Sequence, residues 1–428
     1  MSKSTQIIAP KGTKDILPGQ TGRWQYVEKV FREITKNYGF TEIRTPVIEH
    51  TELFSRGIGD TTDVVEKQMY TFEDYGGRSI TLRPEGTAGV ARAYLENKLY
   101  ADIKPLKLWY EIACFRYEKP QSGRLREFHQ FGVEIFGSHD MLADAEVIAI
   151  GDEFLRGLGI KDLSLRINSI GCAACRPVYR KHLMEYFSKH LGELCDTCKS
   201  RYDRNPMRIF DCKSKVCQGI ANEAPVMLDF LCEECLSDFD ELQKNLNTMD
   251  VLFEIDSRIV RGLDYYTKTA FEFVSGSLGA QDAVCGGGRY DHLLKNIGGE
   301  DIPGVGFGLG IERLLMILEA VDVRFPDTDT PDVIVVSVGE QAKQASLKIL
   351  KELRNSGISS ETDDCFRNIK GQLKYADKRG ARYVLIIGDD ELESGKAKIR
   401  DMRSGEQTEC AFLQIASEIK KMKKEDIL

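Results

Sequence analysis

Long hydrophobic runs are missing from this sequence of 428 residues. A membrane-spanning helix needs about 18 consecutive apolar residues, whereas the apolar runs at residues 333–338 and 384–387 are only long enough for strands. The N-terminus also lacks the apolar stretch of a signal peptide. We therefore expect a soluble, cytoplasmic protein with no membrane partner.

An excess of positive charge is missing as well. The chain has 59 Lys and Arg against 67 Asp and Glu, a formal net charge of −8. This balance argues against a general basic nucleic-acid binder, although a local basic patch still holds phosphates. The length predicts two to four domains, and 42% hydrophobic residues with 29% charged residues exclude a mostly disordered chain.

The common nucleotide-binding loops are absent too. The chain contains no GxxxxGK[ST] loop, and its alternating Gly304, Gly306, Gly308 and Gly310 do not form a GxGxxG fingerprint. Alternating glycines leave one side of a strand bare just before a helix over residues 310–320. A flat ring such as adenine fits on that side with Arg313 stacked over it. Tight packing of the strand on the helix is the alternative.

Two neighbouring strands are predicted to carry charge on one shared side. Residues 106–118 and 127–136 alternate with period 2, which puts Arg116 and Glu118 on the side where the second strand carries Phe128, Gln130 and Glu134. Burying such charges without partners is costly, so we expect a charged ligand there; a solvated sheet face is the alternative. The connection at residues 119–126 is basic and long enough to reach a phosphate backbone, or it is simply a solvated loop.

Three further segments carry polar or glycine-rich clusters. Residues 79–87 place Arg83, Glu85 and Thr87 around Pro84, just before a helix. Residues 261–266 pack an Arg, an Asp and two Tyr, which suits a wall for a small polar ring. Residues 285–290 join three glycines in a row, consistent with backbone that approaches a ligand closely.

Cysteine is clustered rather than scattered. Eight of the 12 cysteines form three CxxC pairs and one CxxxxC pair, namely Cys172, Cys175, Cys195, Cys198, Cys212, Cys217, Cys232 and Cys235. Without a secretory signal, this spacing, which is close to that of zinc ribbons, favours structural zinc at one or two tetrahedral sites over disulfides. Reduced free thiols are the alternative, and no water-activating residue in the cluster indicates catalytic zinc.

The pattern of predicted elements changes twice along the chain. The Cys-rich stretch at about residues 170–245 interrupts a strand-rich region and has the character of an insertion. Near residues 322–331, prolines and short polar residues break all periodicity. Beyond that break, strands at 333–338 and 383–387 alternate with helices at 341–355 and 370–379, which predicts a small α/β domain with parallel pairing.

Five segments along the chain resemble segments of a known enzyme family. Three of them resemble the motifs of class II aminoacyl-tRNA synthetases. Motif 1 is resembled by a strand over residues 40–49, with Pro46 at its bend, and the following residues 57–70. Motif 2 is resembled by the Phe115-Arg116-Tyr117-Glu118 strand with its basic loop, and motif 3 by residues 306–313. Residues 261–266 and 286–290 resemble the two signature peptides of histidyl-tRNA synthetases. The resemblance covers essentially the whole chain.

This resemblance implies a fold and a reaction. It implies an α+β catalytic domain at residues 1–325, with an antiparallel sheet flanked by helices and the Cys-rich domain inserted at about 170–245. An α/β anticodon-binding domain at residues 331–428 would follow. The implied protein is a homodimer that uses L-histidine, ATP with Mg²⁺ and tRNA(His), and that attaches histidine through a histidyl-adenylate. The alternatives are a histidine-sensing regulatory paralogue of ATP-phosphoribosyltransferase without ligase activity, and a class II synthetase for another amino acid.

The resemblance also implies residue roles. The catalytic residues would be Arg261 and Arg116. ATP would be held by Arg116, Glu118, Phe128 and Arg313. Histidine would be held by Glu85, Gly86, Thr87, Arg116, Gln130, Glu134, Arg261, Tyr265, Tyr266 and Tyr290. The acceptor end of the tRNA would contact Lys119, Gln121, Arg124 and Arg126.

Overall fold

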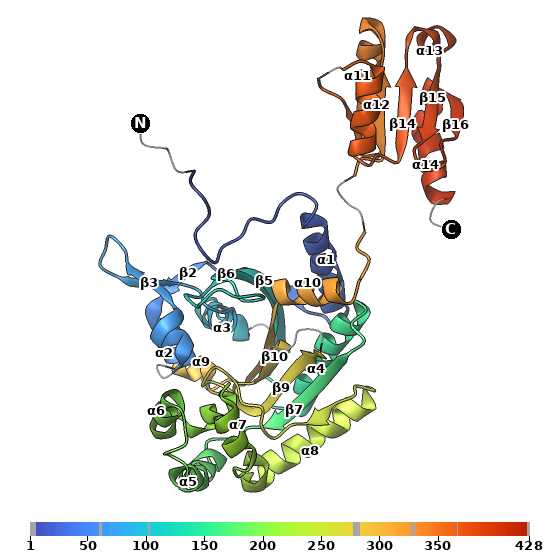
Figure 1. Cartoon of the computed structure of the whole chain (residues 1–428). Coiled ribbons are helices and arrows are strands. Elements are labelled where there is room, and N and C mark those ends of the chain that lie inside the picture. Colours follow the sequence, from blue (N-terminus) through green and yellow to red (C-terminus); the bar gives the residue numbers. More distant parts are fainter. Residues whose placement is uncertain are drawn as a thin grey trace, which may run out of the picture. The chain divides into compact units, whose positions relative to one another are not determined.

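The computed structural model describes residues 6–59, 62–101, 103–276, 283–326, 330–365 and 367–425. The chain divides into two compact units, a large unit at Met1–Phe325 and a small unit at Pro326–Leu428 (Figure 1). Within the described residues, none of the helices combines the length and the apolar character needed to cross a membrane.

An eight-stranded sheet forms the centre of the large unit. Its strand order is β1-β5-β6-β11-β10-β9-β7-β8, and only the edge strands β1 and β8 pair in parallel. The bounds are Thr41–Glu42 for β1, Leu106–Phe115 for β5, Glu127–Phe136 for β6, Leu163–Ser169 for β7, Glu254–Ile255 for β8, Thr267–Ser275 for β9, Ala283–Arg289 for β10 and Gly304–Gly310 for β11. The predicted antiparallel sheet is therefore confirmed.

Helices cover both faces of this sheet because alternate strand residues are apolar on each side. On one face, α1 (Thr21–Asn37), α4 (Met141–Gly157) and α10 (Ile311–Ala320) pack on a core that includes Trp109 and Phe131. On the other face, α2 (Thr51–Ile58), α3 (Thr87–Glu96) and α9 (Leu293–Asn296) pack on a second core. The second core contains Tyr110 and Tyr290, and it lies below the candidate site.

Two predicted strands are shorter than expected. β5 ends at Phe115 and not at residue 118, because the N–H of Tyr117 donates to the carbonyl of Gln68 at 2.6 Å and takes the chain away from β6. The predicted strand at residues 40–49 splits at Pro46 into β1 and β2 (Ile48–His50). β2 joins a separate three-stranded sheet, β2-β4-β3, in which β4 is Ser79–Leu82 and β3 is Tyr70–Glu73.

The Cys-rich insert is helical and lies between β7 and β8 (Figure 1). Its elements are α5 at Cys175–Ser188, α6 at Asp196–Arg204, η3 at Pro206–Asp211, α7 at Lys215–Asn222, η4 at Met227–Phe230 and α8 at Glu233–Thr248. The insert has its own small core, in which Leu183 and Phe187 are fully buried with five of its cysteines. Its last helix, α8, packs against α4 of the large unit.

The small unit is a five-stranded sheet covered by helices. Its strand order is β13-β12-β14-β15-β16, parallel over the first three strands and antiparallel over the last two. The bounds are Val333–Ser337 for β12, Glu340–Asn355 for α11, Ser360–Thr362 for β13, Ile369–Lys378 for α12, Tyr383–Ile387 for β14, Asp389–Ser394 for α13, Lys396–Asp401 for β15, Gln407–Ala411 for β16, Phe412–Gln414 for η6 and Ile415–Glu425 for α14. The predicted α/β fold is confirmed, and β15 and β16 are additions to it.

Candidate active site

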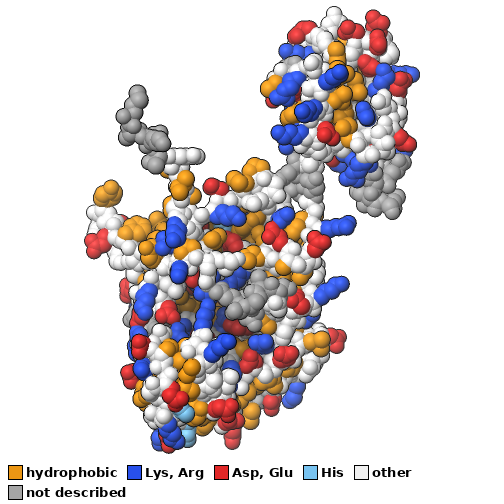
Figure 2. All heavy atoms as spheres, in the orientation of Figure 1, with side chains coloured by type: hydrophobic (Ala, Val, Ile, Leu, Met, Phe, Trp, Pro, Cys, Tyr) orange, Lys and Arg blue, Asp and Glu red, His pale blue; other side chains and the backbone are white. Residues whose placement is uncertain are grey.

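A cavity of about 330 Å³ opens in the large unit beside the ends of β6, β10 and β11. Figure 2 shows Lys and Arg side chains on the visible face of this unit. Eleven of the predicted site residues line the cavity, namely Glu85, Thr87, Arg116, Glu118, Arg124, Phe128, Gln130, Arg261, Tyr265, Tyr266 and Arg313. Several guanidinium groups around one cavity suit an anionic ligand such as a polyphosphate.

The turn between β4 and α3 presents a buried carboxylate. Glu85 accepts hydrogen bonds from the N–H groups of Thr87 and Ala88, each at 2.8 Å, and so caps the start of α3. Burial raises the pKa of Glu85, while these backbone hydrogen bonds and Arg116 oppose the rise. The N–H of Gly86 donates to Gln130 at 3.1 Å, which ties this turn to β6.

The hairpin between β5 and β6 carries an arginine over an aromatic ring. The Nε of Arg116 donates to the carbonyl of Pro84 at 2.8 Å, and its guanidinium carbon lies 5.1 Å from the centre of the Phe128 ring. Glu118 forms an ion pair with Arg124 at 3.4 Å, and Arg313 donates to the carbonyl of Gly123 at 3.2 Å. These contacts fold the hairpin loop back over the cavity.

Arg261 reaches the cavity from the segment before β9. It forms an ion pair with Glu272 of β9 at 2.5 Å and lies over the ring of Tyr266. Its Nε is a buried polar atom that has no hydrogen-bond partner within the described chain. Gly286 faces it from β10, and a Cβ at Gly286 would overlap the guanidinium. The cation is therefore fixed in place with a spare donor.

Three tyrosines and one glutamate form a buried cluster, of which Tyr265 and Tyr266 line the cavity while Tyr290 and Glu134 form a layer beneath it. Tyr265 lies 4.6 Å from Tyr266 and 5.5 Å from Tyr290 between ring centres. Glu134 is fully buried and accepts hydrogen bonds from Tyr290, from Thr87 at 2.7 Å and from Tyr110 at 3.1 Å. Burial raises the pKa of Glu134 to about 8, although the hydrogen bonds from Tyr290 and Thr87 lower it.

The alternating glycines of β11 leave space that neighbouring side chains partly fill. A Cβ at Gly306 would overlap the Glu134 carboxylate, and a Cβ at Gly308 would overlap the Gln130 amide. At Gly310, in contrast, a Cβ would meet nothing within 4 Å. A flat ring therefore has room only at the end of β11 that lines the cavity.

Several predicted residues lie outside the cavity wall. Glu134 and Tyr290 belong to the buried layer, and Gly86 lies behind the wall, where a Cβ would overlap the Tyr110 ring. Of the residues predicted for tRNA contact, Lys119 and Gln121 are exposed, while Arg126 lies 4.0 Å from the centre of the Tyr117 ring. Sequence analysis missed Glu272, although it is the only carboxylate in strand β9. It also missed Gln68 and Val64, for which the sequence offers no signal.

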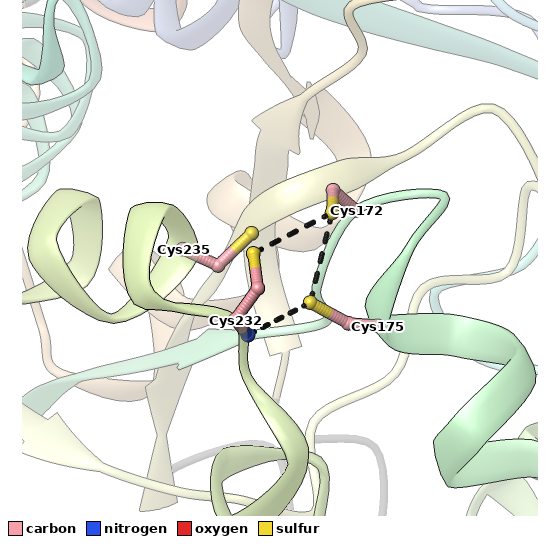
Figure 3. Close-up of side chains that lie close together, drawn as sticks. All are labelled: Cys172, Cys175, Cys232 and Cys235. Carbon is pink, nitrogen blue, oxygen red and sulfur yellow. Dashed lines mark hydrogen bonds between the residues drawn. The ribbon is translucent and has the colours of Figure 1, made fainter.

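The eight clustered cysteines form two separate groups of four. The first group joins the first and last CxxC pairs, Cys172 and Cys175 with Cys232 and Cys235, whose sulfurs all lie within 4.8 Å of one another. Figure 3 shows the first pair at the start of α5 and the second pair at the start of α8, with their sulfurs facing one another. The N–H of Cys232 donates to the sulfur of Cys175 at 3.2 Å. We call this group the outer tetrad.

The second group lies inside the chain segment that the outer tetrad closes. It contains Cys195, Cys198, Cys212 and Cys217, again with all four sulfurs within 4.8 Å, and we call it the inner tetrad. A backbone hydrogen bond from Cys198 is the main cause that lowers the pKa of Cys195 to about 7. Burial works to raise the pKa of Cys172, but backbone hydrogen bonds from Cys175 and Ala174 outweigh it and lower that pKa to about 7. Four sulfurs at this spacing, with an easily ionised thiol in each group, fit a tetrahedral zinc ion.

The sequence matches the family model described as histidyl-tRNA synthetase over residues 12–314. The chain belongs to the histidyl-tRNA synthetase family. The curated histidine–tRNA ligase of Caldanaerobacter subterraneus is 52% identical over 412 residues, which cover 96% of this chain and 99% of that protein. The ligase of Clostridioides difficile is 50% identical, with 96% and 98% covered.

Solved structures place the same family fold on the chain. The apo histidyl-tRNA synthetase of S. aureus matches with a TM-score of 0.83 and 38% identity, covering 97% of this chain and all of that one. A Bacillus halodurans protein described as an ATP phosphoribosyltransferase regulatory subunit/histidyl-tRNA synthetase matches in fold alone, with a TM-score of 0.65 and 22% identity over 90% and 99% of the chains. An anticodon-binding domain model matches residues 332–422 of this histidyl-tRNA synthetase family member.

Proposed function

We infer that the cavity joins L-histidine to ATP as histidyl-adenylate and then passes the histidine to tRNA(His). The activity of the chain, histidine–tRNA ligase, follows from its family membership and from relatives that match over nearly their full length. The observation that carries the site proposal is the single cavity in which Arg116, Arg261 and Arg313 meet a tyrosine wall.

ATP is the nucleotide that this family uses, and we propose that it enters with Mg²⁺ on the hairpin side of the cavity. Phe128 and Arg313 would sandwich the adenine at the open end of β11, since a ring has room beside Gly310. Glu118 would accept a hydrogen bond from the adenine amino group, and Arg116 would neutralise the charge of the α-phosphate. The contact of Arg116 with the Pro84 carbonyl holds it ready for that role.

We propose that histidine lies between the β4–α3 turn and the tyrosines. Glu85 and Gln130, with Thr87, would hold the amino group, and Tyr265 and Tyr266 would face the imidazole. Glu134 and Tyr290 would act from the layer beneath, by fixing the hydroxyls that reach the ligand. A pocket built to hydrogen-bond a polar ring rejects analogues that leave those groups unpaired.

The proposed chemistry needs charge neutralisation rather than a base. The histidine carboxylate is already a nucleophile, and one of its oxygens bonds to the α-phosphorus. The bond between the α-phosphorus and the bridging oxygen breaks, and pyrophosphate leaves with the electron pair of that bond. Arg261 and Arg116 would stabilise the charge that builds on the α-phosphate oxygens. A terminal ribose hydroxyl of the tRNA then attacks the activated carbonyl, and AMP leaves.

For tRNA, we propose two separate contacts. The small unit, which matches the anticodon-binding model, would bind the anticodon. Lys119, Gln121, Arg124 and Arg126 on the hairpin loop would approach the acceptor end, since two of them are exposed and the loop lies over the cavity. We expect this activity in the cytoplasm, because none of the described cysteines is in a disulfide.

We also propose a homodimer that uses the motif 1 region. β2 and β3 expose apolar side chains, of which Ile48 is 49% exposed and Phe72 is 46% exposed. Such a patch is more typical of an interface than of a free surface. Analytical ultracentrifugation of the full chain tests this proposal, which a monomer at micromolar concentration would contradict.

We propose that each cysteine tetrad holds one structural zinc ion. The sulfur spacing and the backbone N–H groups that point at the sulfurs support this assignment. Elemental analysis after mild chelation tests it, because a tight structural site keeps its metal. Fewer than about 0.2 zinc per chain would end the proposal.

Histidine-dependent exchange between ATP and pyrophosphate tests the ligase site, with all twenty amino acids offered separately. We expect exchange with histidine alone. Arg261→His is expected to leave histidine binding largely intact and to slow adenylate formation by about two orders of magnitude or more. Histidine binding without exchange in the wild type would indicate the regulatory paralogue instead, although the matched anticodon-binding domain counts against that alternative.

A further inference from the structure

Side chains of the insert hold the segment Arg261–Tyr266, which forms part of the cavity wall. Arg208 donates to the carbonyl of Gly262 at 2.8 Å, and the amide of Asn205 donates to Asp264 at 3.2 Å. Arg176 donates to the carbonyl of Tyr266. Donors from the insert thus hold Gly262, Asp264 and Tyr266, and every residue of the segment except Asp264 lines the cavity.

Each of these donors directly follows a cysteine of a tetrad or lies on the chain between two of them. Arg176 directly follows Cys175 of the outer tetrad in the first turn of α5, and its Nε also donates to the carbonyl of Ile170 at 3.4 Å. Asn205 and Arg208 lie on the short connection between Cys198 and Cys212 of the inner tetrad. The chain segments that carry the donors are therefore anchored at cysteines of the two tetrads.

The outer tetrad has a second connection to the same region. Lys268, at the start of β9, forms ion pairs with Glu234 and Asp238 of α8, each at 2.7 Å. Its N–H donates to the carbonyl of Gly171 at 3.0 Å, and its carbonyl accepts from Ile170 at 2.7 Å. Lys268 thus holds both the chain just before Cys172 and the helix that begins after Cys232. It lies two residues after Tyr266.

We propose that zinc in the two tetrads fixes the Arg261–Tyr266 segment through Arg176, Asn205 and Arg208, so that metal occupancy and histidine binding are coupled. The three donors are positioning residues, because Arg176 and Arg208 hold the backbone of the segment and Asn205 holds the side chain of Asp264. This inference rests on the proposed zinc sites and the proposed histidine pocket. A site tolerates displacements of only about 0.5 Å, and four sulfurs without a metal have no bond that holds them to that precision.

On the ATP side of the cavity, the arginines are held by contacts outside the insert. Arg116 is held by the Pro84 carbonyl, and Arg313 is held by the carbonyls of Gly123 and Ala283. None of these contacts involves the insert. A disturbance of the insert donors should therefore act on histidine and leave ATP binding nearly unchanged.

The first test compares Arg176→Lys and Arg208→Lys with Arg180→Lys. Arg180 lies on α5 one turn after Arg176, but its hydrogen bond to the Asp203 carbonyl stays within the insert. We expect each of the first two changes to raise the KM for histidine about tenfold, with the KM for ATP within about twofold and zinc content unchanged. Arg180→Lys should change none of the three. Equal changes in both KM values, or no change in either, would overturn the coupling.

The second test needs no variant, because coupling acts in both directions. Zinc transfer from the wild-type chain to a colorimetric chelator is followed with and without saturating histidine. We expect histidine to slow the transfer about fivefold, and ATP alone to change it by less than about twofold. Equal transfer rates with and without histidine would overturn this inference alone. A wild-type chain without zinc would overturn the metal sites together with it, and the exchange assay separately tests the ligase function.

Discussion

The hydroxyl of Tyr290 donates a hydrogen bond to the carboxylate of Glu134, and both side chains are buried below the cavity. The two residues come from β6 and from the end of β10, on opposite sides of β11, where Gly306 leaves space for Glu134 and Gly304 leaves space for Tyr290. A carboxyl group in such a place holds its proton more tightly than one in water, because burial disfavours its charge. Three hydroxyl groups, those of Tyr290, Thr87 and Tyr110, then take their orientation from one carboxyl group.

Replacing Glu134 with Gln should change how stability depends on pH. Burial raises the pKa of Glu134 from 4.5 to about 8, so between these values the folded chain keeps a proton that the unfolded chain has released. The stabilising contribution is complete below about pH 4.5 and is lost as the pH rises through about 8. We expect the melting temperature of the wild type to fall by about 3 °C more than that of Glu134→Gln between about pH 6 and pH 8.5.

The same variant also tests the role of Glu134 in the pocket. An amide keeps the shape of the side chain but fixes a donor toward the surrounding hydroxyls, so we expect a higher KM for histidine in the exchange assay. The KM for ATP should stay within about twofold. Parallel melting curves at all pH values would show that Glu134 is ionised in the folded chain, and an unchanged KM for histidine would remove it from the pocket.

Gly286→Ala should disable the reaction without unfolding the protein. A Cβ at this position would overlap the guanidinium of Arg261, so the cation must move away from its place beside Glu272. Displacing a charge-stabilising group by about 1 Å costs about a hundredfold in rate, and we expect kcat for exchange to fall by about that factor. Gly157→Ala at the end of α4, where a Cβ meets nothing within 4 Å, is the matched control. A normal kcat for Gly286→Ala would contradict the role assigned to Arg261.

The sequence was sufficient for the hairpin that carries much of the site. Period-2 alternation predicted strands on both sides of residues 119–126, and the structure confirms their pairing from Leu106 opposite Phe136 to Phe115 opposite Glu127. The sequence pattern could not predict that the first strand ends at Phe115. The contact that turns the chain there comes from Gln68, which is far away in sequence. The same limit applies to the glycines of β11, whose empty side is filled by Glu134 and Gln130 from the neighbouring strand.

The spacing of the cysteines does not show which of the four pairs belong to the same group. Four closely spaced pairs indicate metal binding, but they do not say which pairs share an ion. The helical insert settles this by bringing the starts of α5 and α8 together, which puts Cys172 next to Cys232. The two inner pairs then form the other group. That nesting depends on the packing of the insert core around Leu183 and Phe187, which no local pattern encodes.

Phe128→Leu should weaken ATP binding selectively. The ring of Phe128 lies 5.1 Å from the Arg116 guanidinium and lines the cavity, and stacking of a base on an aromatic ring is worth about 1–3 kcal/mol. We expect the KM for ATP to rise about tenfold and the KM for histidine to stay within about twofold. Phe115→Leu, whose side chain is not among those that line the cavity, is the control. A larger effect on histidine than on ATP would contradict the proposed division of the cavity.

Pairs of cysteine substitutions should reveal the nested arrangement of the two tetrads. Because each tetrad has its own four sulfurs, Cys195→Ser with Cys198→Ser should remove one zinc ion and leave about one per chain. Cys198→Ser with Cys235→Ser disrupts both tetrads and should leave almost none. Cys410→Ser in the small unit is the control and should keep about two. Equal zinc content in the two double variants, measured by elemental analysis, would mean that the eight sulfurs share a single site.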